Sequence, residues 1–107
     1  MNSKAKGKDG ELELVRILKS YGYKDCRRSQ QYCGVDGDSD VIGLPGIHAE
    51  CKRVEKLNIY QAVTQAQGDC RENNLPTVFH RKNRQPWLVT MTMDDWMKLY
   101  KAAGKLL

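Results

Sequence analysis

The chain has 107 residues, which is enough for one domain with a modest core and too few for two. Hydrophobic residues make up 40% of it, and no apolar run approaches the length of a membrane span, which argues against an integral membrane protein. The net charge of +5 and the pI of about 9.1 favour a polyanionic partner, although mild basicity can also serve solubility alone.

The start of the chain predicts a basic arm followed by an amphipathic helix. Residues 1–8 are rich in lysine and lack the apolar stretch of a secretory signal, so we expect a mobile arm on an intracellular, cytoplasmic protein. Glu11 lies on the apolar stripe of a helix over residues 9–20, where it either needs a partner or stays solvated in the first turn. The rest of that stripe consists of Leu14, Val15, Leu18 and Tyr21.

The remainder of the chain alternates between strand and helix patterns. Pro45 and Gly46 mark a turn within residues 40–52, which predicts a β-hairpin, and Asn58 and Thr92 are suitable N-caps for two later helices. The other expected elements are a strand at 23–29, a polar functional loop at 30–39, a helix at 59–72, strands at 77–80 and 87–90, and a helix at 93–103. The order α-β-β-β-α-β-β-α predicts an α/β (α+β) fold, a mixed sheet flanked by helices, with one domain over 1–107.

The cysteines and the aromatic residues of the last helix favour structural roles. The four cysteines show no C-x-x-C spacing, so we expect reduced thiols, with Cys51 and Cys70 as small core residues. At helical spacing, Trp96, Met97 and Tyr100 are expected to pack in a core or an interface and not to stack on bases. We also expect His48 and His80 to be surface or strand-edge residues.

The chemistry of the chain is concentrated in Asp40, followed ten residues later by Glu50-Cys51-Lys52. Strand alternation places Glu50 and Lys52 on one face with His48, and the hairpin can bring Asp40 alongside them. Two close carboxylates repel each other, and a divalent cation removes that cost. A neighbouring ammonium can orient water or offset charge on a phosphate. The alternative is a solvated Glu-Lys pair, which is common on strand surfaces.

These residues resemble a known pattern. Gly7-Lys8-Asp9-Gly10-Glu11 opening a helix, Ser39-Asp40-Val41-Ile42 on a strand and Glu50-Cys51-Lys52 on the next resemble the PD-(D/E)XK nuclease superfamily. Within it, the chain is most similar to the small archaeal and phage-type Holliday junction resolvases. The resemblance covers roughly residues 5–90 and implies a restriction-endonuclease-like core.

The resemblance also implies a role for each matching residue. Asp40, Glu50 and the backbone carbonyl of Cys51 would hold the metal, with Glu11 contributing directly or through water. Lys52 would orient or activate the attacking water. Gln65 would play the part of a glutamine that follows this strand in several members, and Ser39 stands where many members have proline. The all-oxygen ligand set favours Mg²⁺, with Mn²⁺ able to substitute.

The expected activity is therefore Mg²⁺-dependent cleavage of DNA by a homodimeric resolvase, leaving 5′-phosphate and 3′-hydroxyl ends. The alternatives are a duplex, nicking or flap endonuclease of the same fold, a non-catalytic DNA-binding module, or a plain interaction domain. The residues expected to contact DNA are Lys6, Lys8, Arg27, Arg28, Ser39, Arg53, Lys56, Arg81, Lys82 and Arg84.

Overall fold

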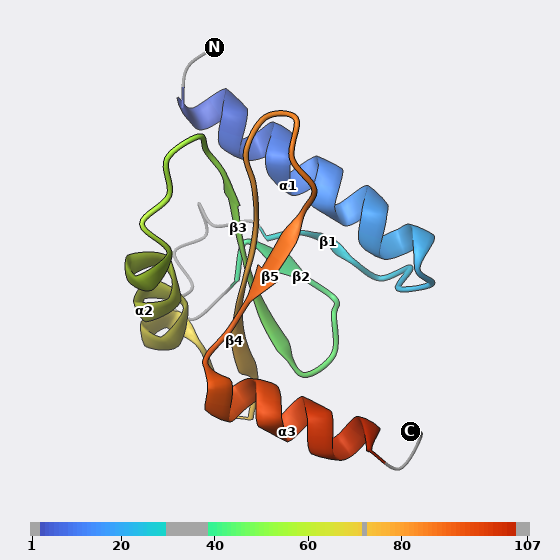
Figure 1. Cartoon of the computed structure of the whole chain (residues 1–107). Coiled ribbons are helices and arrows are strands. Elements are labelled where there is room, and N and C mark those ends of the chain that lie inside the picture. The colour runs from blue at the N-terminus through green and yellow to red at the C-terminus, as the bar shows by residue number, and fades with distance from the viewer. Residues whose placement is uncertain (1–2, 30–38, 72, 105–107) are drawn as a thin grey trace.

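The computed structural model describes residues 3–29, 39–71 and 73–104, with side chains from residue 7 onward. Its elements in chain order are α1 (Ser3–Ser20), β1 (Arg27–Arg28), β2 (Val41–Ile42), β3 (Ile47–Arg53), α2 (Ile59–Asp69), β4 (Leu75–Arg81), β5 (Leu88–Thr90) and α3 (Met93–Ala103) (Figure 1). The expected functional loop falls, over residues 30–38, outside this described part.

The strands form one sheet in the order β1-β2-β3-β4-β5. The central pair, β3 and β4, is parallel, and the other neighbours are antiparallel. This arrangement confirms the predicted mixed sheet flanked by helices, and the order of elements also agrees with the prediction. The finer assignment to a restriction-endonuclease-like core stays a prediction.

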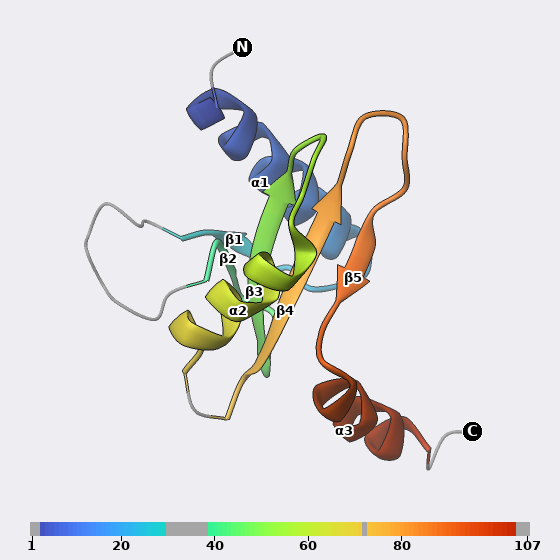
Figure 2. The same ribbon diagram turned by 60° about the vertical axis from the view of Figure 1, so that its left-hand side comes forward.

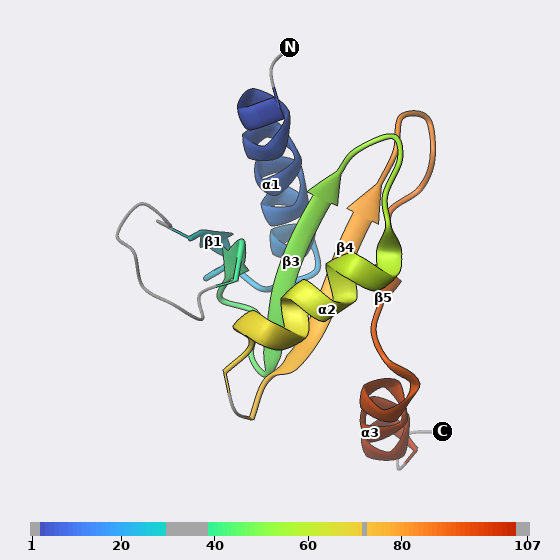
Figure 3. The ribbon, with the colours of Figure 1, turned by 90° about the vertical axis from the view of Figure 1, so that its left-hand side faces the viewer.

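Helices α1 and α2 cover opposite faces of the sheet, as the two side views show (Figures 2 and 3). The larger core cluster lies on the α1 side and consists of Leu14, Val15, Leu18, Cys26, Val41, Ala49, Cys51 and Phe79. The smaller cluster lies on the α2 side and consists of Ala62, Ala66 and Val78. Because a helix covers each face, β3 is buried on both sides over residues 48–51.

Gly10 lets α1 lie directly against the central strand. A Cβ atom at this position would stand 2.5 Å from Cβ of Arg53 and 3.7 Å from Sγ of Cys51. Only glycine permits so close an approach without displacing the helix. The contact also brings Glu11, the next residue, to the end of the sheet where Asp40 lies.

The two predicted hairpins and both predicted caps are confirmed. Val41 pairs with Ala49 across the first hairpin, and β4 pairs antiparallel with β5 across the second. Oδ1 of Asn58 accepts a hydrogen bond from the N–H of Gln61, which caps α2. The hydroxyl of Thr92 accepts one from the N–H of Asp95, which caps α3.

The boundaries of the first two elements differ from the prediction. Residues 3–8 belong to α1, so the predicted mobile arm is wrong for them; lysine and alanine are favourable helix residues. β1 includes only Arg27–Arg28 of the predicted strand at 23–29, because only these two residues pair with β2. Tyr21 does not extend the buried stripe, since α1 ends before it and its side chain is exposed.

The end of α2 and the environment of Cys70 also differ from the prediction. The helix ends at Asp69 and not at residue 72, and Cys70 is half-buried instead of lying in the core. Its thiol donates to the backbone carbonyls of Arg71 and Asn74, which explains its place at the helix end. No helix in the described ranges is both long enough and apolar enough to cross a membrane.

Candidate functional site

Asp40 lies immediately before β2, and its carboxylate is held against the neighbouring strand. Its Oδ2 accepts a hydrogen bond of 2.9 Å from the backbone N–H of Cys51. β2 covers only Val41–Ile42, so this side chain takes the place that a carbonyl of a longer strand would have. The N–H and C=O of one residue in an extended strand point to the same side. The carbonyl of Cys51 is therefore directed toward the side on which Asp40 lies.

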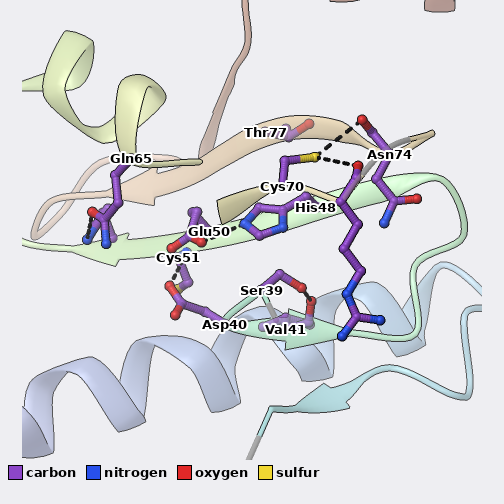
Figure 4. A network of polar contacts seen from close by, with 12 residues as sticks. Ser39, Asp40, Val41, His48, Glu50, Cys51, Gln65, Cys70, Asn74 and Thr77 are labelled. Atoms are coloured by element: carbon purple, nitrogen blue, oxygen red, sulfur yellow. Dashed lines mark hydrogen bonds and ion pairs between the residues drawn. The ribbon is translucent and has the colours of Figure 1, made fainter. Parts of the chain in front are cut away.

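Glu50 is 3% exposed, and beside it lies His48, which is 2% exposed. Nε2 of His48 donates a hydrogen bond of 2.7 Å to Oε1 of Glu50, which fixes the direction of the carboxylate. Figure 4 shows the carboxylates of Asp40 and Glu50 turned toward each other beside Cys51. The expectation that His48 is a surface or strand-edge residue is wrong, because α2 covers this face of β3.

Lys52 and Gln65 meet although they come from different elements. Nζ of Lys52, on β3, donates a hydrogen bond of 3.1 Å to Oε1 of Gln65, on α2. Lys52 lies two residues after Glu50 and therefore on the same face of the strand, as predicted. The contact with Gln65 restricts the direction of an otherwise flexible ammonium group.

Glu11 has the partner that its position on the buried side of α1 requires. Its Oε1 accepts a hydrogen bond of 2.8 Å from Nε of Arg28, and its side chain is 15% exposed. Burial raises the pKa of Glu11, and the nearby charge of Asp40 adds to this effect, while Arg28 opposes it. Glu11 thus lies within electrostatic reach of Asp40, but its carboxylate is bound to Arg28.

The donor atoms of this region suit a divalent cation only in part. In the part of the chain that the structure describes, no three His, Cys, Asp or Glu side chains gather closely enough to hold a metal ion. Arg28 holds Oε1 of Glu11, and the contribution of Glu11 to the metal, directly or through water, stays a prediction. Asp40, Glu50 and the carbonyl of Cys51 remain, an oxygen-only set of the kind that Mg²⁺ and Mn²⁺ prefer.

The thiol of Cys51 does not belong to this set. Burial, followed by the charges of Asp40 and Glu11, raises the pKa of the Cys51 thiol to about 12. A neutral thiol is a poor ligand for a hard cation, since the thiolate is the form that binds metals. The only atoms that Cys51 can offer to the site are those of its backbone.

Arg28 also lowers the net negative charge of this site. The carboxylates of Glu11, Asp40 and Glu50 and the ammonium of Lys52 alone would leave a surplus of two negative charges. Because Arg28 offsets the charge of Glu11, the surplus is one. Two facing carboxylates still repel each other. A divalent cation between them would relieve that repulsion.

Eight of the ten residues predicted to contact DNA fall into two groups, one exposed and one partly buried. The exposed ones, which can reach a phosphate backbone, are Lys8, Arg27, Lys56, Lys82 and Arg84. Lys6 lies in α1, with its side chain outside the described part. Ser39 is buried and its hydroxyl donates to the carbonyl of Val41, and its contact with DNA stays a prediction.

Three of the predicted DNA-binding arginines are partly buried and take part in the fold. Arg28 binds Glu11, and Arg81 binds Glu13. Arg53 lies 4.0 Å from the carboxylate of Glu55, and its buried NH1 has no hydrogen-bond partner among the described residues. Their charges contribute to the local potential, but they are less available to a phosphate than the exposed cations.

Glu13 is the polar residue of α1 that sequence reasoning missed. Its Oε1 accepts hydrogen bonds from Arg81 and, at 2.7 Å, from Nε1 of Trp87. Burial alone would raise the pKa of Glu13, but the two hydrogen bonds outweigh it and hold the pKa below its ordinary value. Because the partners lie some seventy residues further along the chain, no local pattern predicts this contact.

A hollow of about 420 Å³ lies beside the turn between β2 and β3. Its walls include Ser39, His48 and Arg71 but neither Asp40 nor Glu50. The two carboxylates are thus not part of this hollow, and it adds nothing to their chemistry.

Comparison of the chain with protein-family models, with curated proteins and with solved structures gave no significant match. The resemblance to the PD-(D/E)XK superfamily therefore depends on the residues of this chain alone.

Proposed function

We propose that this protein is a Mg²⁺-dependent, structure-specific DNA endonuclease that resolves Holliday junctions. The observation that carries the proposal is the facing pair of carboxylates, Asp40 and Glu50, with the ammonium group of Lys52 on the same face of β3 as Glu50. A solvated surface pair does not account for it, because Glu50 is almost fully buried and bonded to His48, with the carboxylate of Asp40 turned toward it (Figure 4).

Each residue of the site has a definite task in this proposal. Asp40, Glu50 and the carbonyl of Cys51 would hold Mg²⁺, or Mn²⁺ in its place. When bound, the cation supplies positive charge for attack on the phosphodiester. Lys52, held by Gln65, orients the attacking water or offsets the charge that grows on the phosphate oxygens. The expected products have 5′-phosphate and 3′-hydroxyl ends.

The proposed substrate is branched DNA. The net charge of +5 and the exposed cations around Lys82 and Arg84 favour a polyanion. The resemblance adds a homodimer, since symmetric cuts across a four-way junction require two sites. Selectivity for branches would come from the geometry of that dimer, so a duplex, nicking or flap endonuclease is the nearest alternative.

The test is cleavage of a synthetic four-way junction and of a linear duplex of matched sequence, each with Mg²⁺ and with a chelator. Paired, metal-dependent cuts confined to the junction are expected. Asp40→Asn and Lys52→Ala should abolish cleavage while junction binding persists. Asp69→Asn and Lys24→Ala, which make the same changes at exposed positions outside the site, should cleave normally.

Each other outcome has a definite meaning. Equal cutting of both substrates would support the assignment of the active site but would show a general endonuclease and not a junction resolvase. Tight binding without any cutting would favour the non-catalytic DNA-binding module. Retained cleavage in a folded Asp40→Asn variant would overturn the assignment of the site. Calorimetry with Mn²⁺ alone gives a second readout, since binding should be lost in Asp40→Asn and kept in Asp69→Asn.

A further inference from the structure

Helix α3 is an amphipathic helix whose apolar side the described part of the chain leaves largely exposed. Its apolar side chains include Met93, which is 79% exposed, and Trp96 and Tyr100, each 49% exposed. α3 buries no side chain, and Figures 1, 2 and 3 agree that it lies beyond one end of the sheet, apart from α1 and α2. Helices this short are marginal in water unless their apolar face is packed. We therefore expect the apolar stripe of α3 to pack against another surface.

The exposed stripe has the composition of an interface centre. Met93, Trp96, Met97 and Tyr100 follow one another at short helical spacings, which places them on one side of the helix. The rings of Trp96 and Tyr100 stack, with centroids 5.1 Å apart and planes 18° from parallel. Aromatic residues and methionine are enriched at the centres of protein interfaces.

The charges of α3 indicate which partner fits the stripe. Asp94 and Lys101 are seven residues apart and so flank the same edge of the stripe. Neither makes an ion pair with another residue in the described ranges. Lys98, which lies one helical turn from each of them, already pairs with Asp95 at 3.4 Å. One edge of the stripe thus has an acid at its start and a base at its end.

This pattern is complementary to itself when a second helix runs in the opposite direction. When two antiparallel helices are related by a two-fold axis, each edge of the stripe lies beside the same edge of the partner helix. The start of that edge in one helix then lies beside its end in the other. Asp94 of one copy would then face Lys101 of the other, twice in each pair of helices. A parallel pair would instead place this edge against the opposite edge of the partner helix, so Asp94 and Lys101 would not meet across the interface.

We propose that α3 is the self-association surface of this protein, and that it packs antiparallel against α3 of a second copy in a two-fold symmetric dimer. The inference rests on the proposed function in one respect, since it gives a surface to the dimer that a resolvase requires. A dimer formed through another face would overturn the inference alone, loss of cleavage would overturn the function alone, and a monomer would count against both. DNA is disfavoured as the occupant, because the first turn of the helix carries Asp94 and Asp95.

The test is sedimentation equilibrium of the full chain and of two charge variants. Asp94→Lys replaces the acid of the flanking edge by a base, and Lys101→Asp replaces the base at its end by an acid. Each variant alone should dimerise about tenfold more weakly than wild type, because two attractive exposed pairs become repulsive. An equimolar mixture of the two should recover most of the loss, since basic and acidic edges then meet.

Lys24→Asp is the matched control, because it makes the same charge change at an exposed position outside α3 and should leave the dimer intact. A wild-type chain that stays monomeric at every accessible concentration overturns the proposal. So does a dimer that both edge variants leave unchanged, or a mixture that associates no better than its components. α3 belongs to neither core cluster, so the body should fold in every variant and circular dichroism can verify it.

Discussion

The close approach of α1 to β3 at Gly10 leads to a prediction: the same glycine-to-alanine change should stabilise the protein at Gly7 and destabilise it at Gly10. Replacing a helical glycine by alanine is ordinarily favourable by up to about 1 kcal/mol, because alanine has the higher helix propensity. At Gly10, however, the new Cβ would lie 2.5 Å from Cβ and 3.1 Å from Cγ of Arg53. Cβ of Arg53 cannot rotate away, so α1 must move, and such overpacking costs roughly 1–3 kcal/mol.

Gly7, in the same helix, has no atom within 4 Å of the position that a Cβ would occupy. We therefore expect Gly7→Ala to raise the free energy of unfolding by up to about 1 kcal/mol and Gly10→Ala to lower it by about 1–2 kcal/mol. The two variants should differ in melting temperature by roughly 10 °C for a domain of this size. Urea denaturation followed by far-UV circular dichroism measures both. If Gly10→Ala proves as stable as Gly7→Ala, the packing of α1 on β3 described above is incorrect.

Three further predictions concern charged groups. Glu13→Gln should cost about 1–2 kcal/mol at neutral pH, since Arg81 and Trp87 lose a charged acceptor. The pKa of Glu13 lies below its ordinary value of 4.5, so this difference from wild type should vanish as the pH falls through the folded-state pKa; a difference that persists in acid would contradict it. Burial lowers the pKa of His80 below 6.5, so as the pH falls the imidazole becomes protonated in the unfolded chain before it does in the folded protein. Below pH 6.5 wild type should lose stability faster than His80→Asn, and parallel pH profiles from urea titrations would refute this. Changing Lys82 and Arg84 together to glutamine should reduce the salt dependence of DNA binding by about one unit of slope for each phosphate that the protein no longer neutralises. Changing Lys19 and Lys24 to glutamine should leave the salt dependence of DNA binding unchanged. If the two double variants show equal slopes, the DNA does not bind at Lys82 and Arg84.

Local patterns of the sequence predicted the strand that carries the site. Alternation with period two placed Glu50 and Lys52 on one face of β3 and Cys51 on the other, and the structure agrees. The same pattern could not predict that both faces would be buried, because burial of the His48 face depends on where α2 packs. His48, which the sequence predicted to lie at the surface or at a strand edge, is consequently among the most buried residues in the described part.

The features that the sequence did not predict are mostly contacts between residues far apart in the chain. The sequence indicated that Glu11 needed a partner, but its identity, Arg28, depends on how β1 pairs with β2. Glu13 meets Trp87 only because the second hairpin lies beside α1, and neither residue alone has an unusual neighbourhood in the sequence. Periodicity thus predicted the faces of elements, whereas partners followed from tertiary packing.

The parallel pairing of β3 with β4 has a consequence for the motions of this protein. All seven residues of β3, from Ile47 to Arg53, pair with β4, and a helix covers each side of the strand. The amide protons of β3 should therefore exchange with solvent only when the whole domain opens. Those of α3, which joins neither core cluster, should exchange through small local openings in an isolated copy. Glu50 and Lys52 would thus be held on one of the least mobile segments of the described chain, while the helix that we assign to self-association would gain its protection from a second molecule.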